Sequence, residues 1–229
     1  MAALWGLSNH PDSSSIPLLA ISLRAQDPKI RAESLELLGM TASPEAIPLV
    51  RQAILGDLSA DVRYEAALSL VELDGEKSFS LLAGLIENLY SWERLWVIRG
   101  FFHASNYLRL DITASPSAAA VTGALEKALQ DDLPETRKAA AMMLSWLHSP
   151  QANHILSEAY TQEQNSLVKA DILVYAENLF SPAGEALLLE ALTSQDPIVQ
   201  KTAQYLHDNR SFNSRMVDNQ ATGSISIQL

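Results

Sequence analysis

A cationic or polar residue recurs along this chain at steps of 32, 31, 43, 32 and 31 residues. A nearly fixed period of this size is typical of repeat proteins, in which each unit buries its apolar face only by stacking on its neighbours. The period therefore predicts a row of similar units, and it constrains the fold more than any single motif does. The recurring positions are Arg31, Arg63, Arg94, Arg137, Lys169 and Gln200.

Each recurring position lies near the start of a predicted helix. Asp27 stands where a helix N-cap accepts backbone N–H groups, and Pro28 follows in the first turn, where a missing N–H is harmless. Leu35 and Leu38 then follow Arg31 at helical spacing. A second predicted helix precedes each of these, and the short connections predict antiparallel neighbours. The predicted pairs are 14–26/28–40, 44–57/60–73, 76–90/92–104, 117–130/134–147, 150–162/165–179 and 183–194/197–208.

These patterns predict an all-α fold, an α-solenoid of about six antiparallel helix pairs over residues 1–208. The step of 43 residues is eleven longer than its neighbour of 32, and the extra residues are expected within 101–117. Beyond Asn209 the chain is polar and lacks periodicity, so 209–229 is expected to be a disordered C-terminal tail.

Composition narrows the classes of partner. The net charge is -11 and the chain has no run of Lys or Arg, which argues against nucleic acid and against anionic membrane surfaces. The chain has no cysteine, so disulfides and thiolate metal sites are excluded. No apolar run is long enough to span a membrane, and the first residues lack the features of a secretory signal. We therefore expect a cytoplasmic protein.

An acid or amide stands six residues before four of the recurring positions, and the exceptions are Ala25 and Ser194. The combined pattern of Asp or Pro, Ile or Val, Arg, Ala and Leu resembles HEAT repeats. The short period is similar to that of the bacterial repeats in phycobilisome lyase subunits. Tetratricopeptide and ankyrin units fit less well, because their signatures are absent. The four acids or amides are Asp57, Asn88, Asp131 and Glu163.

The resemblance implies a right-handed superhelix whose concave face is lined by the second helix of each pair. It also implies a ladder of polar contacts that joins one repeat to the next. Asp57 with Arg63, and Asp131 with Arg137, would be its rungs, and Glu163 with Lys169 is a looser match. The expected ladder residues are Arg31, Asp57, Arg63, Arg94, Asp131, Arg137 and Lys169.

Aromatic residues gather in the third predicted pair and in the connection after it. On helical spacing Leu95, Ile98 and Phe102 share the face that better suits the core. The opposite face is the candidate for partner binding, since Trp, Tyr and Arg are enriched in binding hot spots. The alternative is that these aromatics fill core space where the repeat departs from its consensus. The candidate partner-binding residues are Trp92, Trp96, Arg99, His103 and Tyr107.

Chemistry-bearing motifs are missing from the sequence. No histidine pair has the i, i+4 spacing of a helical metal site, and no phosphate-binding loop, dinucleotide fingerprint or nucleophile elbow is present. Asp131 and Asp132, at a helix start, are better explained as capping and ladder residues than as an acid/base pair. The sequence therefore predicts no catalytic residues, no metal and no cofactor.

Two functional hypotheses remain. The first is a non-catalytic scaffold or adaptor that binds another protein on the concave face, with a basic or mixed-charge contact surface and salt-sensitive association. The second, implied by the resemblance, is a phycobilin lyase subunit or an adaptor in antenna-protein turnover, with a bilin as ligand. Arg94, Arg99 and Arg109 would then pair with the propionates of the tetrapyrrole.

Overall fold

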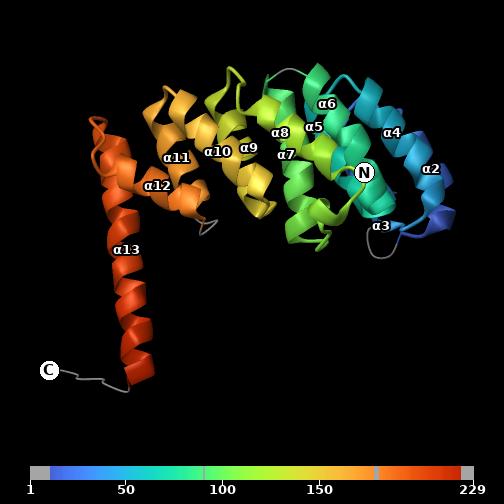
Figure 1. Cartoon of the computed structure of the whole chain (residues 1–229). Helices are drawn as coiled ribbons and strands as arrows, with labels where there is room; N and C mark the ends of the chain where they lie inside the picture. Colours follow the sequence, from blue (N-terminus) through green and yellow to red (C-terminus); the bar gives the residue numbers. More distant parts are fainter. Residues whose placement is uncertain (1–10, 90, 178–180, 223–229) are drawn as a thin grey trace, which may run out of the picture. The chain divides into compact units, whose positions relative to one another are not determined.

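The computed structural model describes the backbone of residues 11–89, 91–177 and 181–222, and the side chains of these ranges except 177 and 210–222. Over the described residues the chain is made of helices and connecting turns, without strands (Figure 1). It forms two compact units, Met1–Met143 and Leu144–Leu229. The all-α solenoid predicted from the period is confirmed.

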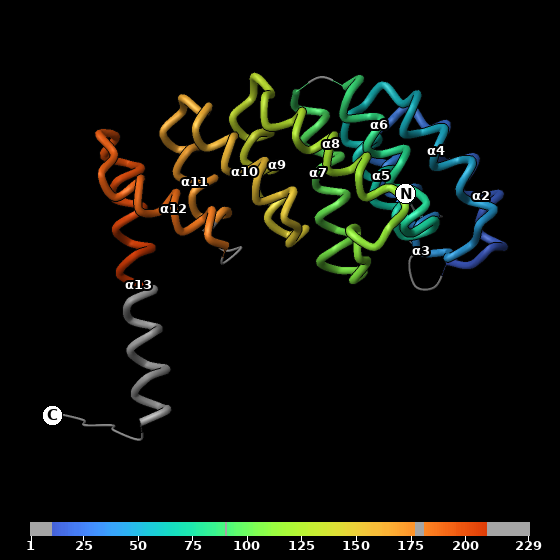
Figure 2. The backbone as a smooth tube through the Cα atoms, viewed as in Figure 1, coloured from blue at the N-terminus to red at the C-terminus, as the bar shows by residue number. Residues whose placement is uncertain are grey.

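The first unit holds the first three helix pairs and most of the fourth. α3 packs on α5 and α5 packs on α7, so these second helices form one row, while α6 packs on α8. The backbone trace shows the same order (Figure 2). The helices are α2 (Ile16–Ser22), α3 (Pro28–Met40), α4 (Ile47–Gly56), α5 (Ala60–Asp74), α6 (Phe79–Asn88), α7 (Ser91–Asn106), α8 (Ala118–Ala128) and α9 (Pro134–Trp146), which reaches past the end of the unit.

The second unit continues the same pattern. α11 packs on α10, on α12 and on α13, and α12 also packs on α13. Its helices are α10 (Pro150–Gln162), α11 (Ser166–Glu177), α12 (Pro182–Ala191) and α13 (Pro197–Thr222). α13 remains helical past Asn209, and residues 223–229 lie outside the described part of the chain. The tail over 209–229 therefore stays a prediction.

Local chemistry explains where the helices begin. The Asp27 carboxylate accepts the N–H of Lys29 at 2.9 Å, and Pro28 is the first residue of α3. Ser149 caps α10 and Ser181 caps α12 in the same way, each before a proline. α3 and α10 begin where they were predicted and α12 begins one residue earlier, because the cap and the proline are both local signals.

The core of the first unit runs between the helix layers. Leu35 and Leu38 of α3, Val50 of α4, and Val62 and Leu70 of α5 are all fully buried. α3 and α5 approach closely, because Ser69 lies against Gly39 and its hydroxyl donates to the Leu35 carbonyl at 2.8 Å. This close contact fixes the spacing of the row of second helices, and hence the surface that the row presents.

The extra residues of the 43-residue step lie after α7. That helix ends at Asn106, and a single 3₁₀ turn, Ile112–Ala114, is the only regular element before α8 in this described connection. Arg109 adopts a left-handed conformation there, with φ of 56°. The connection falls inside the range 101–117 that the repeat spacing indicated.

Candidate functional site

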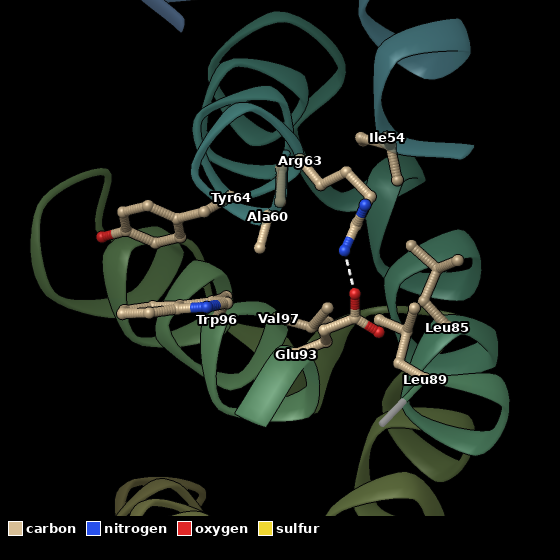
Figure 3. A pocket seen from close by; sticks show the side chains of 10 residues that line it. Ile54, Ala60, Arg63, Tyr64, Leu85, Leu89, Glu93, Trp96 and Val97 are labelled. Atoms are coloured by element: carbon tan, nitrogen blue, oxygen red, sulfur yellow. Dashed lines mark hydrogen bonds and ion pairs between the residues drawn. The ribbon is translucent and has the colours of Figure 1, made fainter. Parts of the chain in front are cut away.

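The candidate residues of the third pair gather on neighbouring faces of α5 and α7. The ring of Trp96 lies 5.1 Å from that of Tyr64, centroid to centroid, at an angle of 43° (Figure 3). The guanidinium of Arg99, one turn further along α7, lies 4.8 Å from the Trp96 ring centroid. Such aromatic and cation–π contacts stabilise a fixed ring orientation at a partly exposed site.

The same surface continues to the end of α7. His103 Nε2 lies 3.3 Å from Glu72 Oε1 on α5, and the His103 ring lies 5.3 Å from that of Tyr107. Trp92 is 47% exposed and Tyr107 is 68% exposed. We call Tyr64, Trp92, Trp96, Arg99, His103 and Tyr107 the aromatic surface.

The predicted residues of α7 thus divide between surface and interior. Trp92 and Arg99 are exposed and Trp96 is partly buried. Of the residues predicted for the core, Ile98 is fully buried, but Leu95 and Phe102 are only partly buried. Phe101, which was not on the predicted core face, is fully buried instead. Phe101 packs edge-on against Phe79 of α6, at a centroid distance of 5.9 Å. Tyr64 was not predicted from the sequence, because its contact with Trp96 of the next repeat arises only when the helices stack.

A small pocket lies between Trp96 and the start of α5, lined by apolar side chains and closed by the ion pair of Arg63 with Glu93 (Figure 3). The centre of a water molecule can move over about 20 Å³ inside it, which is room for one or two waters. Trp96 Nε1 is buried and finds no hydrogen-bond acceptor among the residues that the structure describes. The pocket is too small for a ligand of aromatic size.

The ladder residues join consecutive repeats. Arg31 of α3 donates to the carboxylate of Asp57 through Nε at 2.7 Å and Nη2 at 2.8 Å. Arg94 of α7 donates to Asp131 at 2.7 Å, and Asp131 has a fully buried side chain. Arg63 takes Glu93 as its partner. Each of these bonds links the arginine of one repeat to an acid before or within the second helix of the next.

This geometry corrects the pairing that the resemblance implied. Arg63 donates to the backbone carbonyl of Asp57, and Arg137 to that of Asp131 at 2.7 Å, while the two carboxylates take the preceding repeat's arginine. Arg63 and Arg137 therefore each bond a backbone carbonyl in the loop just before their own helix. Arg31 and Arg94 each bond a carboxylate in the loop before the second helix of the next repeat. Lys169, in the second unit, lies 4.7 Å from the ring centroid of Tyr160.

Asp57 of the ladder and Glu65 beside the aromatic surface have pKa values that are shifted in opposite directions. Burial of Asp57 opposes its ionisation, but the hydrogen bonds from Arg31 and from the Ser59 N–H outweigh it and lower its pKa. Burial instead raises the pKa of Glu65 on α5 to about 7, and the nearby Glu36 and Glu72 add to the shift. Glu65 was not among the candidate residues predicted from the sequence. The repeat gave a signal for it, because Glu65 stands two residues after Arg63, the same repeat position that Trp96 occupies after Arg94.

Within the described ranges, no three His, Asp or Glu side chains lie close enough to hold a metal ion. None of the described helices combines the length and the apolar character needed to cross a lipid bilayer. What the first unit does offer is a row of packed helices with an aromatic, charged surface on α5 and α7.

The stacked helix pairs, bonded to each other by arginine–acid contacts, define a helical repeat protein. The family of HEAT repeats matches residues 15–100 and 112–177, and the chain belongs to this family. The unmatched stretch between the two ranges falls where the 43-residue step places the extra residues. The narrower similarity to phycobilisome lyase subunits stays a prediction.

Solved structures with similar folds share little sequence with the chain. An engineered protein is 20% identical with a TM-score of 0.51, over 85% of this chain and 96% of that chain. Human deoxyhypusine hydroxylase, solved in complex with glycerol, is 18% identical with a TM-score of 0.45, over 90% of this chain and 76% of that chain. No curated protein matches the sequence. At this identity the likeness to the engineered protein concerns the fold alone.

Proposed function

We propose that the chain is a non-catalytic scaffold that binds a partner protein through the aromatic surface of α5 and α7. The observation that carries the proposal is Trp96, whose ring is held by Tyr64 and by Arg99 at a partly exposed position. Aromatic rings and arginines held in this way lose little conformational freedom on binding, which is why such residues dominate interface energetics.

The ladder supports this role by making the row of second helices stiff. Each of the arginines Arg31, Arg63 and Arg94 forms an ion pair with an acid of the next repeat. These pairs hold neighbouring second helices together, so the helix backbones determine the shape of the surface. The row of second helices is the face that the family resemblance assigns to partners. Repeat proteins typically offer such extended surfaces rather than enclosed sites.

The bilin alternative has less support. Of its three arginines, Arg94 donates to Asp131 and to the Ile86 carbonyl, and Arg109 lies in the connection after α7. Only Arg99 belongs to the aromatic surface. A tetrapyrrole with two propionates would need a second cation there.

The test is partner capture from a lysate of the source organism with matched variants of the full chain. The double variant Trp92→Ala/Tyr107→Ala removes two exposed rings of the aromatic surface. Tyr205→Ala is the control, because Tyr205 is 69% exposed on α13, outside that surface. A protein retained by the wild type and by the control but lost with the double variant supports the proposal. Equal retention by all three proteins would overturn it.

A further inference from the structure

Three carboxylates lie next to the aromatic surface on the row of second helices. Glu36 lies on α3, and Glu65 and Glu72 lie on α5. Each of Glu36 and Glu72 is close enough to Glu65 to oppose its ionisation. Within the part of the chain that the structure describes, neither Glu36 nor Glu65 forms an ion pair.

Glu72 connects the acids to the aromatic surface. A methyl group on Gly39 of α3 would overlap the Glu72 carboxylate, so this side chain lies directly over α3. On its other side Glu72 faces His103 of α7 at 3.3 Å. The aromatic surface and the three acids therefore form one continuous area across α3, α5 and α7.

The charge of this area changes from negative to positive along the row from α3 to α7. The acids occupy α3 and α5, whereas the cation of Arg99 lies on α7 against Trp96. A chain segment crossing the row would meet negative charge first, then aromatic rings, then a guanidinium. Carboxylates close together favour a cation, which would relieve their mutual repulsion.

Resting on the function proposed above, we propose that the partner presents a segment bearing lysines or arginines, whose cations pair with Glu36, Glu65 and Glu72. The apolar part of the same segment then contacts Tyr64, Trp96 and Tyr107. Complementary charge fixes the direction in which the segment lies across the helices, because a reversed segment would bring its cations to Arg99.

The test uses a fluorescein-labelled hexalysine peptide and the full chain, with binding followed by fluorescence anisotropy at low salt. Binding is measured at pH 8, above the pKa of Glu65. The triple variant Glu36→Gln/Glu65→Gln/Glu72→Gln is compared with Glu45→Gln/Glu126→Gln/Glu135→Gln, which at this pH makes nearly the same change in net charge at exposed positions elsewhere. We expect the first variant to bind at least about tenfold more weakly and the control to change less than about twofold. Circular dichroism establishes that both variants remain folded.

Equal weakening by the two triple variants would show only a general attraction to an acidic protein and would overturn the inference, as would no binding by the wild type. The captured partner separates this inference from the proposed function. A partner lost with Trp92→Ala/Tyr107→Ala but fully retained by the Glu36/Glu65/Glu72 variant leaves the scaffold role standing and refutes the cationic segment. A partner lost with both variants supports both proposals.

Discussion

Among single residues, Glu65 has the largest consequence for pH. Burial and the neighbouring Glu36 and Glu72 raise its pKa from 4.5 to about 7. The folded protein therefore retains a proton that the unfolded chain releases between these two values. The stability that this group contributes is complete below pH 4.5 and is lost as the pH rises through 7.

We predict that Glu65→Gln removes this part of the pH dependence. At pH 8 the variant should be more stable than the wild type by about 1–2 kcal/mol, a value reduced for solvent screening at a partly exposed side chain. At pH 4.5 the two should be nearly equal. Urea unfolding at both pH values measures the difference, with the exposed Glu126→Gln as control. Parallel pH profiles for wild type and Glu65→Gln would contradict the assignment.

Between neighbouring elements, an ion pair of the arginine–acid ladder should stabilise the fold more than an exposed ion pair does. The Asp57 side chain is 11% exposed and accepts two bonds from Arg31, whereas Glu87 is 49% exposed in its pair with Lys127. We predict that Asp57→Ala destabilises the fold by about 2–4 kcal/mol, because the largely buried Arg31 guanidinium loses its carboxylate partner and keeps only its bonds to the Ala25 and Gln26 carbonyls. Glu87→Ala should cost less than about 1 kcal/mol. Thermal unfolding of the two variants at pH 7 makes the comparison, and similar losses would refute a structural ladder.

The close approach of α3 and α5 gives a second prediction at this scale. A side chain on Gly39 would meet the Ser69 backbone at 3.1 Å, whereas a side chain on Gly84 of α6 would meet nothing within 4 Å. Gly39→Val should therefore destabilise by about 1–3 kcal/mol through overpacking, and Gly84→Val should have little effect. Chemical denaturation distinguishes them. A tolerated Gly39→Val would mean that the two helices can separate without loss.

These elements also show what the sequence could predict. The bounds of α3 and α10 match the predicted 28–40 and 150–162, since an N-cap and a proline act within one turn. The partner of Arg31 could not be read in the same way, because Asp57 belongs to the next repeat. The raised pKa of Glu65 was equally hidden, since burial and neighbouring charges depend on how α3 and α5 stack.

For the molecule as a whole, the repeat architecture predicts that a destabilising substitution affects mainly the unit in which it lies. Each helix pair contacts mainly its neighbours in the chain, so stability is close to a sum of units and of the interfaces between them. The chain forms two compact units, Met1–Met143 and Leu144–Leu229, each with its own buried leucines. A cavity in one unit should open that unit before it opens the other.

We predict that Leu70→Ala and Leu188→Ala produce complementary patterns of hydrogen exchange. Leu70 is fully buried in α5 of the first unit, and Leu188 is 2% exposed in α12 of the second. Each truncation should destabilise by about 2–5 kcal/mol through loss of burial and creation of a cavity. In hydrogen-exchange mass spectrometry Leu70→Ala should speed exchange in α3, α5 and α7 and leave α12 unchanged, with the reverse for Leu188→Ala. Uniform acceleration in either variant would show one cooperative unit, and the binding surface on α5 and α7 would then depend on the second unit for its stability.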